Sequence, residues 1–280
     1  MQKSIKRYFP IFALPTMIAF IICFLVPFIL GLYLSLCDFT TVTDARFVGF
    51  DNFAKIWNDA TFVHSLWFTA LFTVASIVFI NVLAFSVALQ LTKQFRGVHF
   101  FRTVFFMPNL IGGIILGYIW QLIFNGILSY YSRTLTFSPA YGFWGLLILM
   151  CWQQVGYMMI IYIAGLQSIP NDLYEAARID GATSSQKLFR ITIPMSMPSI
   201  TICTFLTLTN SFKLFDQNLA LTAGAPSDKT EMLALNIVNT FYSRTGWEGV
   251  GQAKAVIFFV LVAILVMFQL KITQSKEVQQ

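Results

Sequence analysis

Amide and hydroxyl side chains stand inside two long apolar segments of the sequence. The group consists of Gln153, Gln154, Tyr157, Asn210 and Ser211. These side chains donate and accept hydrogen bonds, so they suit either non-covalent recognition of a polar molecule or hydrogen bonding between helices. No Ser/His/Asp set and no pair of carboxylates accompanies them. The pattern therefore predicts binding or helix packing, and an enzyme is the function class that it favours least.

Two charged residues follow this group. Lys213 and Asp216 are three residues apart, so on a continuous helix they would share one face and could form an ion pair. We expect them to act as a gate element or as a structural pair.

The composition excludes a soluble globular enzyme. Hydrophobic residues make up 57% of the 280 residues and charged residues only 11%, against roughly 25% in an ordinary soluble domain. A soluble fold of this size could not cover so much apolar surface. We therefore expect an all-α polytopic membrane protein.

Metal, cofactor and nucleic-acid sites are not indicated. The four cysteines show neither CxxC nor CxxH spacing, and the two histidines are 35 residues apart; the cysteines are therefore interpreted as small buried hydrophobic residues. The net charge of +6 comes without a run of five basic residues, and basic loops of a membrane protein account for it.

Six segments are long and apolar enough to cross a bilayer, which requires roughly 20 residues. We expect one membrane domain over residues 1–280, with spans at about 11–37, 62–91, 102–124, 142–168, 198–220 and 253–272. The first apolar run is too long for a signal peptide and no small-x-small cleavage site follows it, so we expect it to be retained.

The distribution of lysine and arginine predicts the orientation. Eleven of the eighteen basic residues fall at the two termini and in the 2–3 and 4–5 loops, among them Lys3, Lys6, Arg7 and Lys276. Since basic loops stay on the cytoplasmic side, both termini are predicted to lie inside.

The loop over residues 170–197 has strong local signals. Pro170 ends one helix or opens another, and Asn171 or Asp172 could cap a short helix over 172–180. Gly181 can stop that helix in the left-handed conformation, and Thr183 to Gln186 fits a capping box. A helix–Gly–helix hairpin of this kind fits two interpretations equally well. It could be a surface to which a partner docks, or it could be an ordinary interfacial loop.

Here the sequence resembles a known family. Glu175-Ala176-Ala177, Gly181, Ile191 and Ile193-Pro194 are similar to the EAA loop of binding-protein-dependent ABC importer permeases, with Ile193 where the family usually has leucine. Further segments resemble the branch related to the maltose, lactose, multiple-sugar and glycerol-3-phosphate importers. They are residues 47–53, 102–109, 164–170, 211–216 and 221–226, the last with Ala225 where the branch commonly has glycine.

The resemblance implies a permease subunit of an ATP-driven importer in a bacterial or archaeal cell membrane. The implied partners are a second EAA-type permease, two ABC ATPase subunits and an extracytoplasmic solute-binding protein. The residues implied to couple to the ATPase are Glu175, Ala176, Ala177, Asp180 and Gly181. The chain contains no G-x-x-x-x-G-K-[ST] sequence, which agrees with ATP hydrolysis on a separate chain.

The same resemblance implies a carbohydrate solute, and we expect a di- or oligosaccharide. Amides and hydroxyls near mid-membrane suit sugar hydroxyl groups, so Gln153, Gln154, Tyr157, Asn210 and Ser211 are the candidate solute pathway, with hydrogen bonding between helices as the competing role. Two other functions stay open. One is a secondary transporter working as a homodimer, and the other is a membrane docking or sensor protein.

Overall fold

The structure is a computed structural model that describes residue 9 and residues 13–93 and 95–274. Lys3, Lys6, Arg7 and Lys276, which carry part of the orientation argument, lie outside the described residues, as do residues 11 and 12 of the first expected span. The chain forms two compact units. The first consists of Met1–Ala60 and Ile237–Val260, and the second of Thr61–Asn236 and Leu261–Gln280.

The first unit holds an apolar helical segment and a small outer loop. Ala13–Leu34 is helical and includes the π-helix η1 (Ile21–Leu25) and α2 (Val26–Leu34). After it come β1 (Cys37–Asp38), η2 (Val42–Asp44), β2 (Arg46–Phe47) and α3 (Asp51–Trp57). β1 and β2 pair antiparallel, with Cys37 opposite Phe47. The unit also contains most of α13 (Leu233–Ser243) and the first half of α14 (Glu248–Gln274).

Buried polar side chains hold the first unit together. Asn52 is 1% exposed and donates to the carbonyl oxygens of Ser35 (3.1 Å) and Cys37 (2.8 Å), which ties α3 to the strand ladder. Lys254 of α14 is fully buried, and its Nζ donates to Asp59 Oδ2 at 2.7 Å and to Thr240 Oγ1 at 2.7 Å. Since an uncompensated buried charge is costly, these contacts fix α14 against α13 and against the turn that follows α3.

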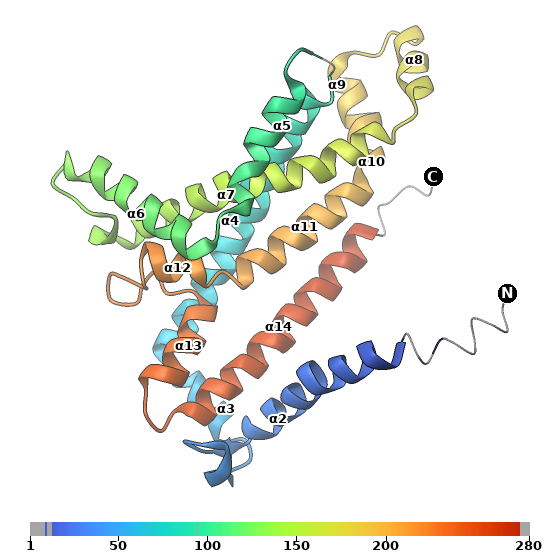
Figure 1. Cartoon of the computed structure of the whole chain (residues 1–280). Coiled ribbons are helices and arrows are strands. Elements are labelled where there is room, and N and C mark those ends of the chain that lie inside the picture. The colour runs from blue at the N-terminus through green and yellow to red at the C-terminus, as the bar shows by residue number, and fades with distance from the viewer. Residues whose placement is uncertain (1–8, 10–12, 94, 275–280) are drawn as a thin grey trace. The chain divides into compact units, whose positions relative to one another are not determined.

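The second unit is built around α7, a long and largely buried helix. It contains α4 (Ala60–Leu91), α5 (Val98–Phe106), η3 (Met107–Leu110), α6 (Gly113–Ser129), η4 (Leu135–Phe137) and α7 (Pro139–Gln167). They are followed by α8 (Asn171–Ile179), α9 (Ser184–Lys187), the π-helix η5 (Leu188–Thr192), α10 (Ile193–Met195), α11 (Met197–Phe212) and α12 (Asp216–Leu221). In Figure 1, α8 and α9 lie at one end of this unit and α12 lies toward the other.

Helix α7 packs closely because glycines face its neighbours. A side chain at Gly156 would collide with the Phe105 carbonyl oxygen of α5, and one at Gly165 would collide with Ser199 of α11. Tyr162 of α7 is 1% exposed and donates its hydroxyl proton to Asn81 Oδ1 of α4 at 2.7 Å. Such close approach and interhelical hydrogen bonding are typical of helices packed within a membrane.

The architecture is that of an all-helical polytopic membrane protein. Among the residues that the structure describes, four helices are long and apolar enough to cross a membrane, namely Ala13–Leu34, Ala60–Leu91, Pro139–Gln167 and Glu248–Gln274. Two further spans arise if each bent helix pair is counted as one. These pairs are Val98–Leu110 with Gly113–Ser129, bent by 101°, and Ser184–Met195 with Met197–Phe212, bent by 68°.

The two bent pairs differ from the straight spans expected over 102–124 and 198–220. The first pair breaks between Leu110 and Gly113, after a 3-10 turn that contains Pro108 and before two glycines. Helix α11 ends at Phe212, and the next helix, α12, begins at Asp216. The segment between α12 and α14 contains the eleven-residue helix α13. The number of spans, their exact ends and the single-domain organisation therefore stay predictions.

One acidic residue shapes the exposed loop of the first unit. The backbone N–H groups of Thr41 (2.9 Å) and Thr40 (3.1 Å) donate to Asp44 Oδ1. These two hydrogen bonds favour the ionised carboxylate and hold the pKa of Asp44 below its usual value, with the bond from Thr41 the larger cause.

Candidate functional site

The loop between α7 and α11 folds through local hydrogen bonds. Helix α8 ends because Gly181 adopts a left-handed φ of 72°. The N–H of Ala182 donates to the carbonyl oxygen of Ala177 at 2.9 Å, and the N–H of Gly181 donates to the carbonyl oxygen of Arg178 at 3.2 Å. Together these bonds form a Schellman motif. The prediction that Gly181 stops this helix is confirmed.

The start of the next helix is also as predicted. Thr183 Oγ1 accepts from the Gln186 N–H at 3.3 Å, and Gln186 Oε1 accepts from the Thr183 N–H at 2.8 Å, which completes a capping box. The expected cap at the start of α8 is wrong. Pro170 occupies the N-cap position there, so the helix begins at Asn171 and receives no hydrogen bond from a capping side chain.

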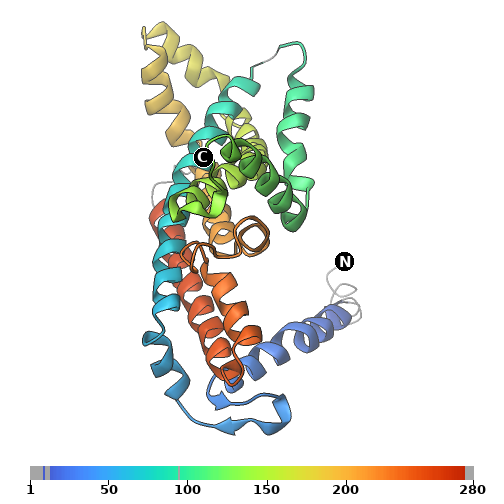
Figure 2. The same ribbon diagram turned by 90° about the vertical axis from the view of Figure 1, so that its left-hand side faces the viewer.

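The residues of the predicted coupling surface are accessible. Glu175, Ala176, Asp180 and Gly181 are exposed, and Ala177 is half-buried. Ile179, on the same helix, is 87% exposed. Both views show α8 projecting at one end of the second unit (Figures 1 and 2).

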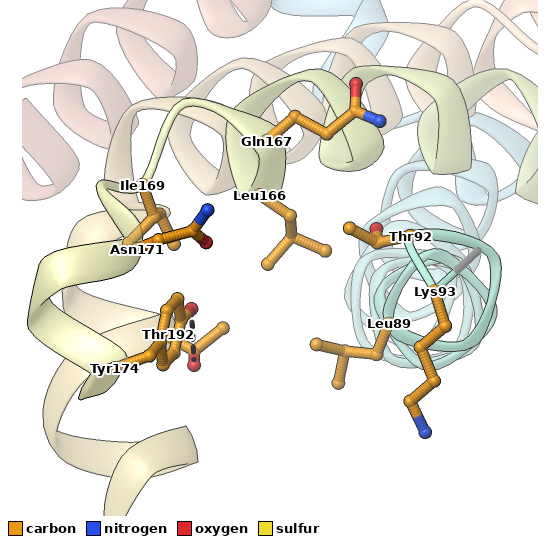
Figure 3. A pocket seen from close by; sticks show the side chains of 9 residues that line it. All are labelled: Leu89, Thr92, Lys93, Leu166, Gln167, Ile169, Asn171, Tyr174 and Thr192. Atoms are coloured by element: carbon orange, nitrogen blue, oxygen red, sulfur yellow. Dashed lines mark hydrogen bonds between the residues drawn. The ribbon is translucent and has the colours of Figure 1, made fainter. Parts of the chain in front are cut away.

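A cavity of about 530 Å³ lies between α8 and the rest of the unit. Figure 3 shows its walls. They are Leu89, Thr92 and Lys93 at the end of α4, Leu166, Gln167 and Ile169 at the end of α7, Asn171 and Tyr174 of α8, and Thr192 of η5. The hydroxyl groups of Tyr174 and Thr192 are 3.1 Å apart. This hydrogen bond joins α8 to the segment that leads into α11.

The candidate pathway residues on α7 and α11 are linked by amide hydrogen bonds. Asn210 Nδ2 donates to Gln154 Oε1 at 3.2 Å, so α11 and α7 are joined directly. Gln153 Nε2 donates to the carbonyl oxygen of Ile111 at 3.3 Å, at the break before α6. Gln217 Nε2 donates to Gln153 Oε1 at 2.8 Å. Gln153 therefore connects α7 with both interrupted segments of the unit.

Exposure divides the five pathway residues into two groups. Gln154, Tyr157 and Asn210 are half-buried and keep part of their surface accessible. Gln153 is 6% exposed and Ser211 is fully buried. The Ser211 hydroxyl donates to the Thr207 carbonyl oxygen at 2.7 Å within its own helix. In this conformation Gln154, Tyr157 and Asn210 are partly accessible, whereas Gln153 and Ser211 are buried.

The expected geometry of Lys213 and Asp216 is wrong. Helix α11 ends at Phe212, Lys213 is its C-cap, and Asp216 is the first residue of α12. The two residues therefore do not share a continuous helix face. Both are exposed, and the ion pairs found among the described residues join Asp59 to Arg244 and Lys254 instead.

Sequence reasoning missed two residues of the site. Gln217 lies at the outer end of the span expected over 198–220, and its place next to Asp216, the possible gate or structural-pair residue, is a local signal of polar contact there. Thr192 was treated only as part of the loop. Its hydrogen bond to Tyr174 spans eighteen residues, a separation that local patterns do not predict.

The comparisons with known proteins decide the family. The family of "binding-protein-dependent transport system inner membrane component" proteins matches residues 80–276, well over half of the chain. The chain belongs to this family. It is a multi-pass inner-membrane protein and the permease component of an ABC import system that works with a binding protein, and ATP hydrolysis in such a system belongs to separate subunits.

Relatives of similar length support the assignment. The chain is 45% identical over 277 residues to the probable starch degradation products transport system permease protein AmyD of Thermoanaerobacterium thermosulfurigenes, covering 96% of this chain and 94% of the relative. It is 29% identical over 288 residues to the multiple sugar-binding transport system permease protein MsmF of Streptococcus mutans, covering 99% of both chains.

A solved structure shares the fold. A chain of a bacterial ABC transporter involved in the import of the acidic polysaccharide alginate superimposes with a TM-score of 0.82, at 22% sequence identity, over 98% of each chain. The permease fold expected from the sequence is therefore confirmed.

Proposed function

We propose that this permease carries a carbohydrate, a di- or oligosaccharide, through the membrane, and that starch-derived glucose oligosaccharides are the first class to test. The observation that carries the proposal is the 45% identity over almost the whole chain to a relative named for starch degradation products. A second relative is named for multiple sugars. Neutral sugars also match the pathway residues, which offer amides and hydroxyls but no charge.

The proposed pathway is lined by Gln154, Tyr157 and Asn210, with Gln153 and Ser211 holding the wall behind them. The half-buried amides of Gln154 and Asn210 bond to each other at 3.2 Å, and sugar hydroxyls could replace that bond without leaving either amide unsatisfied. The Tyr157 ring offers a face for the C–H groups of a pyranose. Lys213 and Asp216, exposed near the end of α11, are proposed as gate residues rather than as a pair.

Coupling is proposed to run through the exposed end of α8. Glu175, Ala176, Ala177, Asp180 and Gly181 would contact an ABC ATPase subunit, since they form the accessible part of a capped helical hairpin. The proposed complex contains this chain, a second EAA-type permease, two ATPases and an extracytoplasmic binding protein. Both termini and the α8 loop would lie in the cytoplasm, as the distribution of basic residues favours.

Uptake into proteoliposomes tests the proposed function. The complete complex is reconstituted with internal ATP and its external binding protein, and a series of starch-derived glucose oligosaccharides is offered. We expect accumulation that requires ATP and the binding protein. Uptake that continues without ATP and follows an ion gradient would instead favour a secondary transporter. Stable membrane insertion with no uptake of any sugar would favour a docking or sensor protein.

A pair of variants separates solute contact from helix packing. Replacing Gln154 and Asn210 together by leucine removes both hydrogen-bonding partners, which is close to neutral for stability when the pair serves packing alone. We expect uptake to fall while thermal stability is kept. Ser86→Ala, on the exposed face of α4, is the matched control. Unchanged uptake in the double variant would remove these two residues from the pathway.

A further inference from the structure

Helix α8 is held to the rest of its unit by very little. Among its residues only Tyr174 and Ala177 are half-buried, and the others are exposed. Tyr174 packs its ring against the hydrophobic core of the second unit. On the side facing α4, the cavity of about 530 Å³ leaves α8 without close packing (Figure 3). The angle of the helix therefore depends on its two ends and on Tyr174.

The hydrogen bond of Tyr174 has a defined direction. The Thr192 hydroxyl donates its proton to the Lys187 carbonyl oxygen at 3.2 Å. Its oxygen is then left to accept from the Tyr174 hydroxyl at 3.1 Å. Thr192 is 6% exposed and lines the cavity beside α8, so its hydroxyl is held by two hydrogen bonds at the cavity wall. The bond is thus a directed link between α8 and η5.

Thr192 stands where a movement of α8 could reach the membrane helix. It is the last residue of η5, and its carbonyl oxygen accepts from the Ser196 N–H at 3.0 Å. Ser196 lies at the junction where the chain bends by 68° into α11. The path from Tyr174 through Thr192 to the Ser196 backbone therefore consists of two hydrogen bonds.

We propose that Tyr174 is a positioning residue that transmits displacement of α8 to α11 through its hydrogen bond to Thr192. The proposal rests on the function proposed above, in which an ATPase moves α8. Without the bond, α8 could tilt into the cavity beside it, and movement imposed on α8 would be lost there. Docking of the ATPase would be unchanged, because the hydroxyl of Tyr174 points away from the exposed face of the helix (Figure 3).

The experiment measures sugar transported per ATP hydrolysed in the complete reconstituted complex. Tyr174→Phe removes one hydroxyl and keeps the ring, and Thr192→Val removes the other. We expect each to lower the ratio roughly two- to tenfold, the effect of one hydrogen bond of net strength ~0.5–1.5 kcal/mol. Binding-protein-stimulated ATP hydrolysis and co-purification of the ATPase should stay at the level of the unchanged protein.

Three further variants make the test specific. Thr192→Ser retains the hydroxyl and should restore the ratio. The double variant Tyr174→Phe/Thr192→Val should be no worse than Thr192→Val alone, since that change already removes the bond that Tyr174→Phe removes. Tyr118→Phe, on the exposed face of α6, should have no effect.

The outcomes separate this proposal from the one it rests on. A ratio unchanged in Tyr174→Phe, or single effects that add in the double variant, would overturn the positioning role while transport by the unchanged complex stands. If the unchanged complex neither hydrolyses ATP nor moves sugar, the proposed function fails, and the role of Tyr174 in coupling fails with it.

Discussion

The buried charge cluster of the first unit gives a sharp stability prediction. Asp59 Oδ2 accepts from Lys254 Nζ at 2.7 Å and from Arg244 Nη1 at 3.0 Å. The Lys254 side chain is 0% exposed and the Arg244 side chain 36%. Changing Asp59 to Asn removes the negative charge and leaves a buried ammonium group. Breaking a buried ion pair in this way costs about 3–5 kcal/mol.

The two cationic partners should differ strongly. Changing Arg244 to Gln breaks a contact that is partly open to water, and such pairs contribute about 0–1 kcal/mol. Changing Lys254 to Met in the Asp59→Asn background removes the buried positive charge and should recover most of the lost stability. The predicted order of destabilisation is Asp59→Asn first, the double variant well below it, and Arg244→Gln last.

Unfolding of the purified protein in mixed micelles, titrated with a denaturing detergent, measures these differences. A loss of about 3 kcal/mol corresponds to a roughly 150-fold change in the unfolding equilibrium constant. Equal losses in Asp59→Asn and Arg244→Gln would refute the reasoning, as would a double variant less stable than Asp59→Asn alone. Either result would mean that Lys254 is hydrated rather than buried.

Three further predictions test other parts of the molecule. Gly181→Asp forces a side chain into a left-handed conformation at a cost of about 1–2 kcal/mol, into open space; we expect sugar uptake to fall while the amount of protein in the membrane stays normal. Gly156→Ala would place a methyl group against the Phe105 carbonyl oxygen and should lower the free energy of unfolding in detergent by about 1–3 kcal/mol. Gly126→Ala is the control, because no atom lies within 4 Å of the added methyl group, and it should leave the free energy of unfolding unchanged. The pKa of Asp44 is lowered in the folded loop, so its carboxylate should stabilise the loop fully above the ordinary pKa of aspartate, and this stabilisation should be lost as the pH falls through the lowered pKa. Hydrogen exchange of residues 38–47 should therefore become faster over that pH range. The Asp44→Asn variant should not show this pH dependence.

Local chemistry explains what the sequence could predict. The capping box of Thr183 and Gln186 and the helix stop at Gly181 depend on residues within five positions of each other. Side-chain type and spacing specify such contacts directly. The apolar composition likewise specifies a polytopic helical protein, because few other structures satisfy backbone groups in a bilayer.

Breaks within apolar segments were harder to predict. Residues 104–119 are predominantly apolar, so hydropathy predicts one span there, and Pro108 and Gly112 give no clear signal of a bend because proline and glycine are common in membrane helices. At the end of α11, Lys213 and Asp216 fit a helical spacing, yet α12 packs against α6 through Gly113 and Gly117 and turns the chain away. Tertiary packing overrode the local pattern at both places.

Long-range partners lay beyond sequence reasoning. Asp59 and Lys254 are 195 residues apart, and the bond between Gln153 and Gln217 spans 64 residues. Composition and periodicity carry no information about such pairs, which arise only when the helices are packed. The pathway residues could therefore be selected by type and depth, but their division into half-buried and buried groups required the structure.

Isolation of this chain from its native membrane in mild detergent tests the central claim most directly. The proteins that co-purify are identified, and ATP hydrolysis is measured with and without the binding protein and its sugar. The account predicts recovery of a second permease, an ABC ATPase and a binding protein, with hydrolysis stimulated by the loaded binding protein. Recovery of the chain alone as a homodimer, with no associated ATP hydrolysis, would contradict it.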